Sequence, residues 1–338
     1  MPKMQDSATL PAADARWSTV GRFAGYGAAL SMALYLVVKV VWISAALLGH
    51  RPDDFGTAGW VALNSVTVVM AVTGVALGLA LARPWGRRLP AAPVVFFSWA
   101  GSGFLVPMLP YALLSGVIGA FGGGSGAGGS GAGDSGSADS GSVPQWESLF
   151  LTVGFIGMAA GLAVAVPVYL RDRWPGAFVG RAGDAHGRPS ASLAVAGAAA
   201  AALGLLWSYW ALGGTAGLDP AHRDHWDLNG RLLNGSSALW ALLGAWSVRT
   251  LTRGRPARLP RWIPMTLGFA ASGSLFAWSG WKLPMVITRP GGFVTAEYMS
   301  VAVVEHLAGI LVGLTLMAAV LRSVPKGEDA RRGRPSDA

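Results

Sequence analysis

Two ionisable side chains interrupt an apolar stretch near the C-terminus, which reads SVAVVEHLAGILVGLTLMAAVL (residues 300–321). Helical spacing puts Glu305 and His306 on the same face as the small residues Gly309 and Gly313. A carboxyl group beside an imidazole can bind a polar ligand, relay a proton or act as an acid or base. Because ionisable residues in a membrane helix are costly, this pair is a candidate functional site.

Lys39 is the partner that the sequence offers for Glu305. At a rise of 1.5 Å per residue, Lys39 lies roughly 13 Å below the outer end of its apolar segment, and Glu305 roughly 12 Å below the outer end of its own. Matching depth predicts an ion pair, since either charge alone would cost about 2.5–3.5 kcal/mol in a membrane helix. The alternatives are a purely structural salt bridge and a lysine that extends its ammonium group to the interface. His306 taken alone is more typical of a satisfied core histidine.

The elements that hold these residues are predicted to be transmembrane helices. Of the 338 residues, 52% are hydrophobic and only 13% are charged, about half of the charged fraction of soluble proteins. Backbone groups in lipid must be satisfied within the segment, so each long apolar run is predicted to be a helix. We therefore expect an all-α polytopic membrane protein with eight transmembrane helices. The predicted spans are 22–48, 59–82, 91–119, 147–170, 190–214, 230–251, 260–283 and 297–322.

The distribution of basic residues predicts the orientation. The N-terminal leader, alternate connections and the C-terminal tail together hold 20 of the 26 lysine and arginine residues. The positive-inside rule then places both termini in the cytoplasm of a multi-pass plasma-membrane protein. The net charge of +9 is explained in the same way, with anionic membrane lipids as the expected partners and no nucleic acid.

An internal repeat predicts two four-helix halves. Residues 63–105 align without a gap to residues 233–275, with 13 identities in 43 positions. An even number of spans per half gives both halves the same orientation, which is a parallel 4+4 duplication. The predicted organisation is a cytoplasmic leader (1–21), a first repeat (22–170) with a disordered Gly/Ser loop (122–142), a cytoplasmic linker (171–189), a second repeat (190–322) and a disordered basic tail (323–338).

Polar and small residues recur at matching places in the two repeats. Asn64 corresponds to Asn234, and Ser102 corresponds to Ser272. Such residues let membrane helices approach closely and hydrogen-bond across the contact. The alternative is that they line a pore or a ligand site, so all four are kept as site candidates. Lys282 stands beside two tryptophans and is expected to anchor its helix at the interface.

The sequence has no recognisable motif for metal binding or for catalysis. His222, His225 and Asp227 have the right chemistry for zinc, but their loop spacing matches no known zinc motif, so no metal site is predicted. The chain has no cysteine and none of the common hydrolase or metalloprotease motifs. No cofactor is expected, and the enzyme class is less favoured than a non-enzymatic role.

A short stretch, LLWSYWALGGTAGLD (205–219), resembles the YWALGG signature of uncharacterised multi-pass integral membrane proteins of actinobacterial type. A degenerate copy, YLVVKVVWISAALLG (35–49), places Lys39 and Trp42 at similar positions. The resemblance implies a membrane location and a multi-pass topology. It implies no activity, because the family has none assigned.

Together these patterns favour a permease-like or small-molecule-binding membrane protein with a polar site in the outer half of the bundle. Lys39, Glu305 and His306 would form that site, with the two asparagines as polar lining. One alternative is a membrane-embedded enzyme that acts on a lipid-linked substrate with Glu305 or His306 as acid or base. Another is a structural or partner-binding subunit. The sequence leaves the oligomeric state open.

Overall fold

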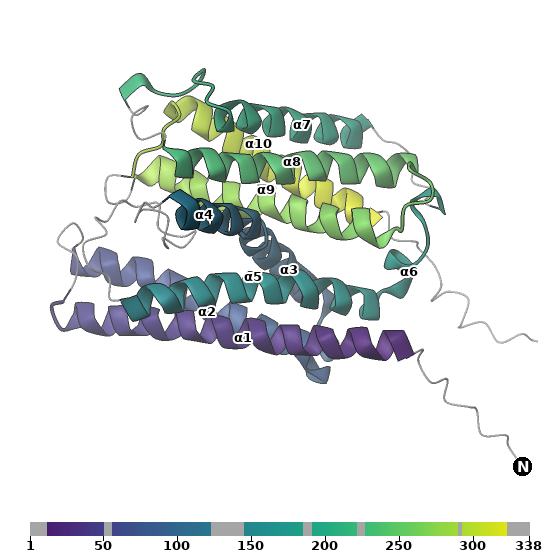
Figure 1. Ribbon diagram of the computed structural model, residues 1–338, viewed down its shortest axis with the longest axis horizontal. Helices are drawn as coiled ribbons and strands as arrows, with labels where there is room; N and C mark the ends of the chain where they lie inside the picture. The colour runs from purple at the N-terminus through teal and green to yellow at the C-terminus, as the bar shows by residue number, and fades with distance from the viewer. Residues whose placement is uncertain are drawn as a thin grey trace, which may run out of the picture. The chain divides into compact units, whose positions relative to one another are not determined.

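The computed structural model describes residues 12–50, 56–122, 145–184, 191–221, 227–289 and 293–322, and over these ranges it is helical, without a β-sheet. Figure 1 shows the helices as long, separate rods. Residues 123–142 of the predicted Gly/Ser loop and the predicted tail lie outside the described residues. The first helix begins at Ala12, well before the predicted start of the first span, so part of the predicted leader is helical.

The chain forms two compact units. Unit 1 comprises residues 1–98 and 129–173, and unit 2 comprises residues 99–128 and 174–338. The boundary falls inside helix α3 (Ala91–Leu105), which therefore begins in unit 1 and ends in unit 2. The units are defined by contacts, whereas the predicted halves are defined by sequence similarity, so the predicted domain organisation stays a prediction.

Unit 1 is built on three helices, α1 (Ala12–Leu47), α2 (Thr57–Ala82) and α5 (Gln145–Arg173), which run side by side in Figure 1. Small residues set their separation. A Cβ atom at Gly25 would come 2.9 Å from the carbonyl oxygen of Gly78 in α2, and one at Gly161 would come 2.6 Å from Cβ of Ala28. The helices approach too closely at these points for larger side chains, as membrane helices commonly do.

The connection after α2 is held against the end of α5. It forms a short 3-10 helix, η1 (Pro84–Arg88). The hydroxyl of Tyr169 donates to the carbonyl oxygen of Gly86 at 3.0 Å, and the guanidinium of Arg173 donates to that of Leu89 at 2.8 Å. Side chains of α5 therefore satisfy backbone carbonyls that the turn leaves free.

The third predicted span is one apolar segment but two helices. Helix α3 ends at Leu105, and α4 (Met108–Gly122) follows after Pro107. Proline lacks an N–H group and its ring clashes with the preceding turn, which explains the break. Within unit 2, the hydroxyl of Ser236 donates to the carbonyl oxygen of Pro107 at 2.6 Å. That bond satisfies an acceptor beside the interrupted helix.

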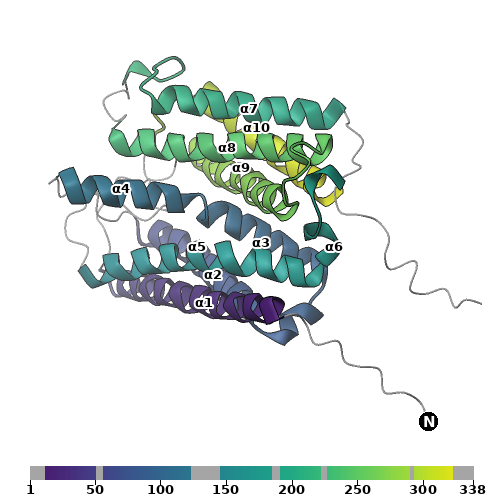
Figure 2. The same cartoon turned by 45° about the vertical axis from the view of Figure 1, so that its right-hand side comes forward.

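Unit 2 contains four longer helices, α7 (Ala191–Ala211), α8 (Leu228–Arg253), α9 (Trp262–Thr288) and α10 (Met299–Arg322), seen together in Figure 2. Their apolar faces meet in one core that includes Trp210, Leu275 and Leu316. Both ends of α8 are capped by neighbouring residues of the chain. Asp227 caps its first turn by accepting from the N–H of Gly230 at 2.8 Å, and Gly254 closes its last turn in the left-handed conformation.

Two paired glycines bring α3 against α9 inside unit 2. A Cβ atom at Gly103 would overlap the backbone of Gly273. Beside this crossing, the indole N–H of Trp99 donates to the hydroxyl of Ser272 at 2.9 Å. The serine–glycine pairs that the sequence aligned at 102–103 and 272–273 therefore lie on two helices that touch each other.

Short backbone bridges connect loops at the two ends of unit 2. Near the end of α8, Arg181 pairs with Pro260, beside the short helices α6 (Pro175–Phe178) and η2 (Ala182–Asp184). At the opposite end of α8, Leu218 pairs with Glu297. The sequence predicted neither bridge. Part of the predicted linker 171–189 is thus ordered against the loop before α9.

Six segments of the described chain are long and apolar enough to cross a membrane, which is the composition of a multi-pass membrane protein. They are Arg16–Leu47, Thr57–Ala82, Ala91–Ile118, Leu149–Arg173, Ala191–Ala211 and Met299–Arg322. Helices α8 and α9 occupy the other two predicted positions, but they carry more polar residues and do not join that set. Eight spans and the 4+4 repeat therefore stay predictions.

The close crossing of α3 and α9 gives a first testable prediction. Replacing Gly103 with alanine should lower the midpoint of thermal unfolding, because overpacking at such a site costs about 1–3 kcal/mol. Gly116 of α4 is the matched control, since nothing lies within 4 Å of a Cβ atom built there. Gly116→Ala should leave the midpoint unchanged or raise it. Circular dichroism of the purified protein in detergent measures both, and equal midpoints would contradict the close crossing.

Candidate functional site

Glu305 lies inside unit 2, on the inner face of α10. Only 4% of its surface is exposed, and its Oε2 accepts a hydrogen bond from the indole N–H of Trp207 in α7 at 3.0 Å. The sequence predicted an inward-facing carboxyl group here, and its burial agrees with that prediction. The indole partner was not predicted. A buried carboxyl group needs a donor of this kind, because an unsatisfied one costs free energy.

His306 is buried beside Glu305 and keeps one nitrogen without a partner. It is 3% exposed, and its Nε2 lies 3.4 Å from Oε1 of Glu305. Its Nδ1 is buried without a hydrogen-bond partner among the described residues. Buried polar atoms are nearly always paired with protein or water. The unpaired nitrogen is an exception to this rule, and it makes His306 a candidate for contact with a ligand.

Two further charged residues of unit 2 act on this pair. The ammonium group of Lys282 in α9 and the carboxyl group of Glu297, just before α10, both interact electrostatically with Glu305. Lys282 acts on His306 as well. Lys282 is half-buried and Glu297 is 9% exposed. Trp207, Lys282, Glu297, Glu305 and His306 are called the Glu305 cluster below.

Glycines of α10 explain why the cluster faces inward. A Cβ atom at Gly309 would overlap the hydroxyl of Ser279 in α9, and one at Gly313 would lie 2.7 Å from the backbone nitrogen of Phe276. This face of α10 is consequently pressed against α9. Glu305 and His306 lie one turn before Gly309 on the same face, so their side chains enter the interior of the unit.

Lys39 has aromatic neighbours in its own unit. Its Nζ lies 4.0 Å from the ring centroid of Trp42 and 5.4 Å from that of Tyr35, which is cation–π geometry. Lys39 belongs to unit 1 and Glu305 to unit 2, so their predicted ion pair stays a prediction. Within its own unit, Glu305 has Lys282 as the cation that acts on it. Sequence reasoning assigned Lys282 only an anchoring role.

A second tryptophan–glutamate pair occurs in unit 1. The indole N–H of Trp42 in α1 donates to Oε2 of Glu147 in α5 at 2.8 Å. Glu147 is not among the predicted site residues, although it is the first residue of the predicted span 147–170. An acidic residue at the end of a span, facing a tryptophan of another span, was the available signal. In each unit the first long helix thus donates an indole hydrogen bond to a glutamate of the last.

The predicted polar lining residues bond mainly to their own helices. The side-chain amide of Asn64 donates to the carbonyl oxygen of Trp60 at 2.9 Å, and that of Asn234 donates to Gly230 at 3.0 Å. Ser102 donates to the carbonyl oxygen of Trp99 at 3.4 Å. Ser272 donates to that of Phe269 at 3.0 Å while accepting from Trp99. All four predicted residues are buried, and a ligand-lining role stays a prediction.

The zinc-type residues of the loop before α8 separate into two groups. Asp227 is the N-cap of α8, and its carboxylate accepts from a backbone N–H. His222 and His225 lie outside the described residues. Among the residues that the structure does describe, no three acidic, histidine or cysteine side chains gather as a metal site would require.

Comparison with protein-family models, with curated proteins and with solved structures finds no match. The resemblance of the YWALGG stretch to a family of membrane proteins therefore stays a prediction. In unit 2 this stretch contains Trp210, whose indole N–H donates to the carbonyl oxygen of Ala216 at 2.7 Å. The stretch includes the end of α7 at Ala211, and the hydrogen bond from Trp210 holds the turn that follows against this helix.

The buried indole bond gives a second prediction. Trp207→Phe removes the donor and leaves the Glu305 carboxyl group without its hydrogen bond, which should lower the free energy of unfolding by about 1–3 kcal/mol. Trp42→Phe removes the equivalent bond to Glu147. It should cost less, because Trp42 is only partly buried and water can reach that bond more easily. Chemical unfolding in detergent, followed by circular dichroism, compares the two. An equal loss in both variants would contradict the greater importance of the buried pair.

Proposed function

We propose that this protein is a permease-like or small-molecule-binding protein of the plasma membrane, and that the Glu305 cluster holds its solute. The single observation behind the proposal is the buried, unpartnered Nδ1 of His306 next to Glu305 in an apolar helix. Ionisable side chains in an apolar membrane helix cost free energy, and residues that are kept there despite this cost usually serve a function.

The chemistry of the cluster favours a small polar solute. Glu305 and His306 offer a carboxyl group and an imidazole side by side, and the charges of Lys282 and Glu297 act on that carboxyl group from the same unit. One oxygen of Glu305 accepts the indole hydrogen bond and the other lies beside Nε2 of His306. The unpaired Nδ1 of the imidazole is therefore the atom that would contact a solute.

Two alternative functions, a membrane-embedded enzyme and a structural subunit, would involve the same residues. An enzyme would use Glu305 or His306 as acid or base, but no described contact brings a nucleophile to them. A structural role draws support from the bond between Trp207 and Glu305, since that bond stabilises unit 2 without any solute. The experiment below separates the structural role from solute binding.

A solute screen is the third prediction. Purified full-length protein would be tested in detergent with amino acids, polyamines, dicarboxylates and sugars, with thermal unfolding as the readout. We expect at least one of these solutes to raise the unfolding midpoint of the wild-type protein. The gain should vanish in Glu305→Gln and in His306→Gln, because neither amide reproduces the charge or the ring nitrogen that faces the solute.

Glu147→Gln is the matched control for this screen, since Glu147 is also a buried glutamate that accepts an indole hydrogen bond. It should keep the full solute response. A solute response that is lost equally in the Glu147 and Glu305 variants would point to general destabilisation. If no solute stabilises the wild type and Glu305→Gln unfolds at a lower temperature, the cluster is structural and the proposal fails.

The proposed orientation, with both termini in the cytoplasm, is the fourth prediction. The chain has no cysteine, so single cysteines can be introduced without background labelling. Ser125→Cys, in the Gly/Ser loop, should react with a membrane-impermeant maleimide in intact cells. Ser323→Cys, in the tail, should react only after the membrane is permeabilised. The opposite pattern would reverse the orientation and move the Glu305 cluster to the inner half of the membrane.

A further inference from the structure

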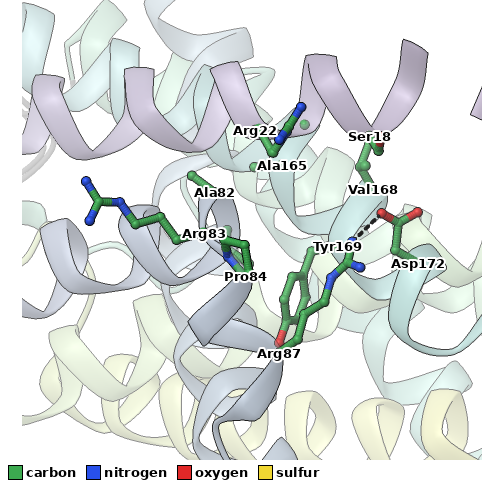
Figure 3. Close-up of a pocket in the computed structure, with 12 residues that line it drawn as sticks. Ser18, Arg22, Ala82, Arg83, Pro84, Arg87, Ala165, Val168, Tyr169 and Asp172 are labelled. Atoms are coloured by element: carbon green, nitrogen blue, oxygen red, sulfur yellow. Dashed lines mark hydrogen bonds and ion pairs between the residues drawn. The ribbon is translucent and has the colours of Figure 1, made fainter. Parts of the chain in front are cut away.

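A cavity of about 280 Å³ lies within unit 1, at the end where α1 begins and α2 and α5 finish. This volume is far above the roughly 10–15 Å³ that one water molecule needs. Figure 3 shows the side chains around it, which come from the three helices and from the turn after α2. Its polar lining is Ser18, Arg22, Arg83, Arg87, Tyr169 and Asp172.

The lining carries an excess of positive charge. It holds three arginines and one aspartate, and Arg87 donates to Asp172 at 3.0 Å. The side chain of Arg87 is 60% exposed, so its pairing with Asp172 leaves donors free to reach an additional anion. Figure 3 shows the guanidinium of Arg83 directed away from that pair, and it lies 5.9 Å from the ring centroid of Tyr26. Arg87 is therefore better placed for a ligand than Arg83, and Arg22 adds a second cation to the lining from α1.

The cavity adjoins the surface that lipid would cover. Arg22 lies within the apolar segment Arg16–Leu47, a few residues from its start. Its neighbours Phe23 and Tyr26 are 73% and 42% exposed. Exposed aromatic residues next to arginines are typical of a helix at the level of lipid headgroups. An anion bound at Arg22 can therefore keep an attached hydrocarbon chain against α1.

We propose that this cavity binds the phosphate group of an anionic membrane lipid. Arginine matches phosphate geometry through paired N–H donors, and basic pockets at the ends of membrane helices are suited to lipid headgroups. The site lies in unit 1 and does not depend on the Glu305 cluster. A free phosphate ion presents the same chemistry to the arginines, but it would make no use of the exposed apolar face of α1.

Titration of the full-length protein tests the site. Purified protein in a neutral detergent at constant ionic strength would be titrated with phosphatidylglycerol, phosphatidylcholine or sodium phosphate, and the apparent Kd read from thermal stabilisation. We expect saturable stabilisation by phosphatidylglycerol alone. Arg22→Gln and Arg87→Gln should each raise the apparent Kd about fivefold, the effect of one cation near a lipid surface. Asp172→Asn should lower it by a similar factor, because it removes the competing carboxylate.

Arg253→Gln is the control, since Arg253 is an exposed arginine at the end of α8 in unit 2. It should leave the apparent Kd for phosphatidylglycerol within about twofold of wild type, less than the effect of one nearby cation. Equal weakening in this variant would show diffuse attraction by surface charge and overturn the site. Equal stabilisation by sodium phosphate would assign the cavity to free phosphate, and equal stabilisation by phosphatidylcholine would remove the role of charge. The Asp172 variant keeps the test decisive even if an arginine variant fails to fold.

Discussion

Close approach of helices at small residues is the constraint on which the rest of this structure depends. In unit 2, Gly309 and Gly313 bring α10 against α9 so tightly that side chains would not fit between their backbones. The face of α10 that carries these glycines must then point inward, and Glu305 lies on that face. The placement of a costly carboxyl group is thus a consequence of helix packing, which in lipid relies on contact between small residues.

Burying polar groups in this way requires internal partners, and tryptophan supplies them twice. The indole group combines a large apolar surface with one N–H donor, so it can pack in a core and still satisfy a carboxyl group. Trp207 does this for Glu305 in unit 2, and Trp42 does it for Glu147 in unit 1. The difference lies in what remains around each glutamate. Glu305 has an adjacent imidazole with an unpaired nitrogen and a nearby lysine.

The two candidate sites make opposite use of charge. In the Glu305 cluster, the carboxyl group of Glu305 and the imidazole of His306 are buried, so a change of partner there alters the local electrostatics strongly. In the cavity between Arg22 and Arg87, the arginines are exposed and numerous, so an anion would be attracted over a distance and held by several donors. A membrane protein can hold both kinds of site, because the membrane interior and its headgroup layer are different solvents.

The sequence by itself determined that the chain is helical and apolar enough for a membrane, and it located Glu305 and His306 on an inward face. Those properties follow from composition and from the helical period, which are local. Only the tertiary structure decided the partners. Trp207 is 98 residues from Glu305, and Trp99 is 173 residues from Ser272. The indole hydrogen bond to Glu147 and the electrostatic effect of Lys282 on Glu305 likewise depend on which helices pack together. Single-sequence patterns do not encode that choice, because many helix pairs have compatible small-residue faces.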